Sequence, residues 1–140
     1  MRTVAILAIA GGMGFWLANF AISLTPVAGE YRAALSIAYV PMLIEALFGG
    51  LVVGFLVSLF FVRFFDRIPV QGPILKSLVL SGIALVAVSV VIEAPARFSD
   101  ATIDSLRFFL IGAAINGLRF LALGLVIGYV YGRLDRSGTR

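Results

Sequence analysis

The stretch "PMLIEALFGGLVVGFLVSLFFV" occupies residues 41–62 and contains a single charged residue, Glu45. About 20 apolar residues in a row are enough for an α-helix to cross the ~30 Å hydrocarbon core of a bilayer. A chain of 140 residues has too much surface for its volume to hide such a stretch in a soluble core. The stretch therefore predicts a transmembrane helix.

Three further runs have the same character and lie at about residues 4–24, 74–92 and 106–131. The whole chain is 61% hydrophobic and only 13% charged, whereas a soluble domain is about 25% charged. None of the runs alternates as a β-barrel strand does. We expect an all-α fold, an integral membrane four-helix bundle that forms a single transmembrane domain over residues 1–140, in the cell membrane as a multi-pass protein.

The charges between the runs predict an orientation. One side of the membrane collects most of the basic residues: Arg2, Arg63, Arg67, Lys76, Arg133, Arg136 and Arg140, against Asp66 and Asp135. The other side carries Arg32, Arg97 and Arg107 against Glu30, Glu93, Asp100 and Asp104. Because basic residues favour the cytoplasmic side, we expect both termini there. The same residues suggest contact with anionic lipid at the cytoplasmic face and no binding of nucleic acid.

The two halves of the chain resemble each other in outline. Each half pairs an outgoing helix with a returning one and ends on a basic motif, "RFFDR" at 63–67 and "RLDR" at 133–136. Two parallel helical hairpins are therefore a hypothesis for the internal arrangement.

Small residues recur at four-residue spacing in two of the runs. Ala46, Gly50 and Gly54 lie in 41–62, and Gly124 and Gly128 lie in 106–131. This spacing lets two helix backbones approach closely. It predicts packing within one bundle or, alternatively, an interface in a homo-oligomer or a larger membrane complex.

Four charged or amide side chains lie well inside the apolar runs: Asn19, Glu45, Asn116 and Arg119. A guanidinium that faces lipid is costly, roughly 2.5–3.5 kcal/mol on insertion scales, so Arg119 needs a partner. Glu45 is the one acidic residue deep in a predicted span, and Asn116 lies one helical turn from Arg119. We expect an intramembrane polar cluster, which is either a structural ion pair that fixes helix register or a site for an ion or substrate.

Expectations for the remaining segments are simpler. Residues 29–39, "GEYRAALSIAY", are compatible with an amphipathic helix outside the membrane, and Glu93 falls in the polar loop after the third span. Phe60, Phe61, Phe64 and Phe65 suggest an aromatic girdle that faces lipid.

The residue inventory limits the function. The sequence contains no cysteine and no histidine, which removes thiolate metal sites, the usual haem ligands and Ser–His–Asp chemistry. We expect no cofactor, no metal site and no enzymatic activity. The expected function is that of a structural or accessory membrane subunit that works through helix–helix assembly. The alternative is an oligomeric ion- or proton-coupled transporter or channel that uses Glu45 and Arg119.

Overall fold

The computed structural model describes residues 1–99 and 104–138, and within these ranges the regular structure is entirely helical. The elements in chain order are α1 (Arg2–Ser23), α2 (Pro26–Ala34), α3 (Tyr39–Phe64), the short η1 (Phe65–Arg67), α4 (Pro73–Val88), η2 (Ser89–Glu93), α5 (Ala94–Phe98) and α6 (Ser105–Arg136). Asp100 and Arg140, two of the charges that entered the orientation argument, lie outside the described residues.

Four helical segments are long and apolar enough to cross a membrane: Arg2–Ser23, Tyr39–Arg67, Pro73–Phe98 and Ser105–Arg136. Large apolar side chains are exposed along them; Phe48 and Ile83 have 64% and 61% of their surface open. Such a surface suits a lipid solvent. The predicted all-α chain with four candidate spans is confirmed at this level, whereas the side of the membrane that holds the termini stays a prediction.

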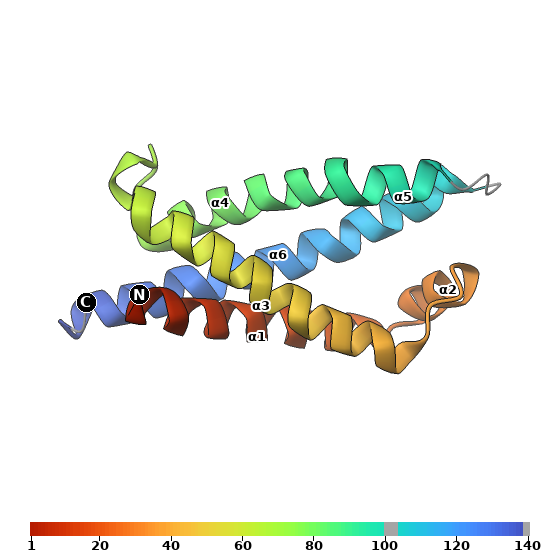
Figure 1. Ribbon diagram of the computed structural model, residues 1–140, viewed down its shortest axis with the longest axis horizontal. Helices are drawn as coiled ribbons and strands as arrows, with labels where there is room; N and C mark the ends of the chain where they lie inside the picture. The colour runs from red at the N-terminus through yellow and green to blue at the C-terminus, as the bar shows by residue number, and fades with distance from the viewer. Residues whose placement is uncertain (100–103, 139–140) are drawn as a thin grey trace.

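The two ends of the bundle differ in what they hold (Figure 1). Both termini and the link between α3 and α4 lie at one end, which we call the terminal end. The helices α2 and α5 lie at the other, which we call the distal end. Along the bundle, α1 packs against α3 and α6, and α4 packs against α6, whereas α3 and α4 touch over a much shorter length.

Glycine determines how closely the helices approach. A Cβ atom built on Gly54 would lie 2.7 Å from the carbonyl oxygen of Ala8, so α1 and α3 meet backbone to backbone. A Cβ atom on Gly128 would lie 2.5 Å from the Cα atom of Ile74 in α4. Gly50 and Gly124 lie at the same two contacts, on Phe15 and on Ser81, and Ala46 is buried on α3. The small residues therefore lie at contacts within one chain.

An aromatic core closes the terminal half of the bundle. Phe61 has none of its surface exposed, and its ring lies 5.0 Å from that of Tyr131 and 5.2 Å from that of Phe65. The expectation that the whole phenylalanine run faces lipid is wrong for Phe61, although Phe60 is 50% exposed. Phe61 points inward because it lies on the face of α3 that meets α6.

The third span extends beyond its predicted end at residue 92. A π-helical turn, η2, follows α4, and the amide of Ala94 donates to the carbonyl of Ser89 five residues earlier. Pro95 follows directly and has no amide hydrogen to donate. The helix nevertheless continues as α5, so Glu93 lies on a helix at the distal end and not in a loop.

The short helix α2 lies at the distal end. Thr25 caps it by accepting a hydrogen bond from the amide of Ala28, and Pro26 occupies its first turn. The helix ends at Ala34, earlier than the expected 29–39 segment, because the chain turns at Ser36, where φ is +54°. This turn leads into α3 and leaves α2 at the mouth of a cavity.

Candidate functional site

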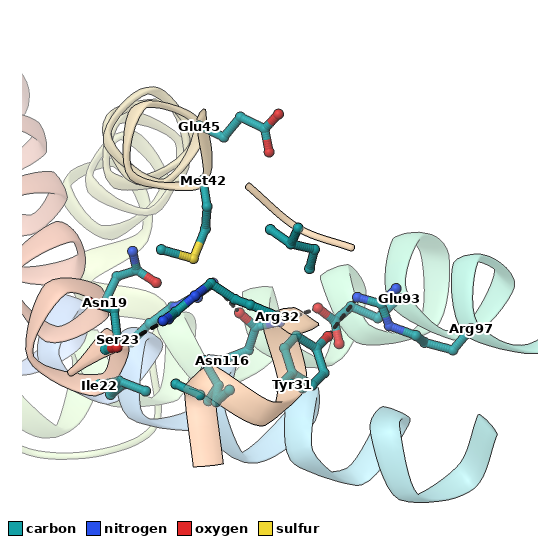
Figure 2. Close-up of a pocket in the computed structure, with 15 residues that line it drawn as sticks. Asn19, Ile22, Ser23, Tyr31, Arg32, Met42, Glu45, Glu93, Arg97 and Asn116 are labelled. Carbon is teal, nitrogen blue, oxygen red and sulfur yellow. Dashed lines mark hydrogen bonds between the residues drawn. The ribbon is translucent and has the colours of Figure 1, made fainter. Parts of the chain in front are cut away.

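A polar cavity of about 190 Å³ lies at the distal end, where α1, α2, α3 and α6 meet the extension of α4 (Figure 2). Three arginines and two glutamates line it: Arg32, Arg97, Arg119, Glu45 and Glu93. Uncharged polar side chains complete its wall: Asn19, Ser23, Tyr31 and Asn116. The four polar residues predicted from the sequence as an intramembrane cluster thus line one cavity.

Arg119 is connected to a carboxylate through Asn116. Its Nη1 donates to Asn116 Oδ1 at 3.1 Å, and Asn116 Nδ2 donates to Glu93 Oε1 at 2.6 Å. The guanidinium also lies 5.8 Å from the ring centroid of Phe15, within the range of a cation–π contact. The cluster therefore includes Glu93, which the sequence analysis assigned to a loop.

Glu45 lies apart from this chain of hydrogen bonds. It is exposed and, within the described residues, has no hydrogen bond or ion pair, although it lines the cavity together with Arg119. Figure 2 shows its carboxylate at the top of the view, apart from Glu93 and Arg97 at the lower right. A direct Glu45–Arg119 ion pair is therefore not formed here, and whether the cluster has a structural or a binding role stays a prediction.

Tyr31 and Arg97 join α2 to α5. Arg97 Nη2 donates to the Tyr31 hydroxyl at 2.6 Å, and the guanidinium lies 5.4 Å from the ring centroid. Burial raises the pKa of the Tyr31 phenol, and the nearby Arg97 charge opposes this rise. The phenol therefore remains a neutral hydrogen-bonding group over a wide pH range.

Gly112 on α6 makes room for this junction. A Cβ atom at this position would lie 2.9 Å from both Glu93 Oε2 and the Tyr31 hydroxyl oxygen. The absence of a side chain lets α2 and the extension of α4 converge on α6. Glu93 can thereby reach Asn116 from the neighbouring helix.

Arg32 connects α2 to the end of α1. Its Nη1 donates to the carbonyl of Ser23 at 3.1 Å, and its guanidinium lies 4.9 Å from the ring centroid of Tyr39. The last carbonyls of a helix lack partners within the helix, and they attract cations. Arg32 therefore holds α2 against the C-terminal end of α1, on one side of the cavity.

Several buried polar atoms around the cavity have no hydrogen-bond partner. Three of them are donors, Asn19 Nδ2, Arg97 Nε and Arg119 Nε, and one is an acceptor, Glu93 Oε2. Asn19 is only 1% exposed. Unpaired buried donors of this kind are costly. Among the unpartnered buried atoms of the described cavity wall, donors thus outnumber acceptors, and the wall has one more positive than negative side chain.

Sequence reasoning found four of the cavity residues and missed Tyr31, Arg32, Glu93 and Arg97 as members. These residues lie outside the apolar runs or at their ends, where hydropathy does not indicate which side chains contact each other. One signal was available, because Glu93 and Arg97 are four residues apart and would share a helix face. In the part of the chain that the structure describes, no group of three or more acidic residues could hold a metal ion.

Comparison of the chain with protein-family models, with curated proteins and with solved structures finds no match. The chemistry of the cavity is therefore the main indication of function.

Proposed function

We propose that this chain is a non-enzymatic multi-pass membrane protein that binds an anionic group in the distal cavity, as the binding unit of a transporter or channel. The observation that supports this proposal is the excess of buried donors. Three of the four unpartnered buried atoms of the cavity are N–H groups, and two of these belong to guanidiniums. An anion with several acceptor oxygens would satisfy them together, because charge-assisted hydrogen bonds are the strongest that a site can make.

The same proposal includes the topology. With both termini cytoplasmic, as the distribution of basic residues favours, the distal cavity faces the outside of the cell membrane. An anion would then enter from the external solution or from the outer leaflet. We also propose that the chain is arranged as two parallel helical hairpins and that it forms a homo-oligomer.

The position of Glu93 favours an anion over a cation as the ligand of the cavity. Its Oε1 is already occupied by Asn116, and the Glu45 carboxylate lies apart from it. Two separated carboxylates form a poor cation site, whereas the guanidiniums of Arg97 and Arg119 lie on the wall of the same cavity. Arg119 and Arg97 are therefore assigned to the ligand, and Glu93 is assigned to holding Asn116 in place.

Anion-dependent stability of the purified protein tests the proposal. We expect inorganic phosphate or glycerol 3-phosphate to raise the unfolding temperature in a neutral detergent. Arg119→Gln should raise the half-saturating concentration of the anion at least about tenfold. Arg67→Gln removes a charge at the terminal end and serves as the matched control. The proposal fails if no anion stabilises the protein or if both variants respond like the original chain.

A second candidate is the accessory subunit, and the exposed side of α4 favours it. Only 11% of the apolar window of this span is buried, the smallest share of the four. A Cβ atom added to Gly82 would have no neighbouring atom within 4 Å, and this glycine lies in a shallow apolar depression with Val79, Ile83, Val86 and Val90. Because the chain has no cysteine, a Gly82→Cys variant would form a disulfide-linked dimer in membranes only if two copies meet at this face.

A further inference from the structure

A second cavity adjoins the polar one on the side of the membrane-spanning helices. This second cavity, of about 300 Å³, shares five wall residues with the polar one: Met42, Glu45, Glu93, Asn116 and Arg119. The rest of the second wall is mostly apolar and includes Gly49, Val53 and Val88. Arg119 and Asn116 therefore lie where a polar space meets an apolar one.

The apolar part extends further between α3 and α4. A third cavity of about 370 Å³ shares Val53 and Val88 with the second one. Its wall consists only of apolar side chains, among them Phe60 and Ala87. The three spaces thus form a single series that runs from polar at the distal end to wholly apolar toward the terminal end.

The packing of the helices explains this groove. Glycine holds α3 against α1 and α4 against α6, whereas α3 and α4 share only a short contact. The two helices converge at the link between them and diverge toward the distal end (Figure 1). The groove between α3 and α4 therefore faces the surrounding lipid.

From this series of cavities, and building on the proposed function, we infer that the ligand is an anionic lipid. Its phosphate lies by Arg119 and Arg97, and one acyl chain lies in the groove between α3 and α4. The groove from Glu45 to Phe60 is about 22 Å long at 1.5 Å per residue. One lipid leaflet fills half of a ~30 Å hydrocarbon core. This depth is shorter than the groove, so the groove is long enough to hold an acyl chain of one leaflet.

A charged head and an apolar tail match the two ends of the series. Transfer of the acyl chain from the bilayer into the groove gains little hydrophobic free energy, because both surroundings are apolar. The chain instead brings the phosphate to the depth of Arg119, and the N–H groups of the cavity provide the selectivity for the anion.

Binding of purified lipids to the delipidated protein tests this inference. The test compounds are dioleoyl phosphatidylglycerol, dioleoyl phosphatidylcholine and glycerol 3-phosphate, measured by thermal unfolding and by native mass spectrometry. We expect phosphatidylglycerol to bind, phosphatidylcholine to bind much more weakly, and glycerol 3-phosphate to need an about tenfold higher concentration than phosphatidylglycerol.

A variant of the groove separates the tail from the head. Gly49 lies on the wall of the second cavity and has no atom within 4 Å of a Cβ position, so Gly49→Leu fills the groove without a clash at Cβ. Gly117 is equally unobstructed and lines none of the three cavities, so Gly117→Leu is the matched control. If Gly49→Leu fails to fold, Ala87→Phe blocks the third cavity instead.

Gly49→Leu should weaken phosphatidylglycerol about tenfold and leave the response to glycerol 3-phosphate unchanged, while Gly117→Leu changes neither. The inference is overturned if glycerol 3-phosphate binds as well as the lipid and Gly49→Leu has no effect; a soluble anion is then the ligand, and the proposed function stands. Equal binding of phosphatidylcholine overturns the anionic head group. If neither anionic compound binds the original chain, the inference and the proposed function fail together.

Discussion

The four long helices run through both ends of this bundle, but the two ends differ in how they satisfy their polar groups. At the terminal end the Ser77 hydroxyl donates to the carbonyl of Gly124 at 2.6 Å, and Phe61 and Tyr131 pack edge to face. At the distal end, buried N–H groups of Asn19 and Arg119 have no partner. Among the described residues, the terminal end holds one unpartnered buried hydroxyl, that of Ser58, whereas the distal end holds several unpartnered N–H groups around one polar cavity.

The largest effect is expected from breaking the closed end. Gly128→Leu would place a side chain against the backbone of Ile74 and Pro73, and overpacking that forces the backbone to move costs about 3 kcal/mol. We expect the variant to unfold at a much lower temperature in detergent than the original chain. Gly117→Leu, at an open glycine, is the control. Equal stability of the two variants would contradict the close approach of α4 and α6.

The next effect compares the two glutamates of the distal end. Glu93→Gln weakens the acceptor of Asn116 and should destabilise the protein by about 2 kcal/mol, because hydrogen bonds to charged groups are among the stronger ones. Glu45→Gln alters an exposed side chain without a hydrogen bond and should change the stability little. Chemical unfolding of both variants measures the difference. A larger loss of stability in Glu45→Gln than in Glu93→Gln would instead support a direct ion pair between Glu45 and Arg119.

A smaller effect of opposite sign is expected at Asn19. Its Nδ2 is buried without a partner, and an unsatisfied group of this kind costs about 1–3 kcal/mol. Asn19→Leu should therefore raise the unfolding temperature in the absence of ligand and reduce the response to phosphate. A variant that is less stable and binds phosphate as before would show that Asn19 serves the packing alone.

The smallest effect concerns the pH. Because burial raises the pKa of Tyr31 in the folded protein, the unfolded chain releases this proton first as the pH rises. The contribution is fully present below the ordinary tyrosine pKa of about 10 and is lost as the pH rises toward the higher pKa of the folded state. We expect Tyr31→Phe to flatten the alkaline fall in stability in a pH series of thermal unfolding. An unchanged slope would contradict the burial of the phenol.

The sequence was sufficient to locate the four apolar helices, because length and hydropathy decide whether a helix can span a bilayer. It also identified Arg119 and Asn116, since a polar side chain inside an apolar run stands out. It missed Glu93 because hydropathy ends a span where the apolar run ends, and nothing in it reports that the helix continues past Pro95.

The sequence also did not show which face of each helix is buried. Phe60 and Phe61 are equally apolar, so hydropathy cannot tell which of them meets lipid and which meets α6. The pairing of Arg119 had the same weakness. Glu45 was the acidic residue inside an apolar run, whereas the partner that is used approaches from another helix through Asn116.

The π-helical turn at Ser89–Glu93 has a consequence for how the two ends can vary independently. One additional residue in a turn rotates everything after it by about 100° relative to an uninterrupted α-helix. The small-residue contact of α4 with α6 and the direction of the Glu93 and Arg97 side chains are therefore set by separate phases of one helix. Removing a single residue from this turn would leave the glycine contacts in register while swinging both charged groups toward a different neighbour.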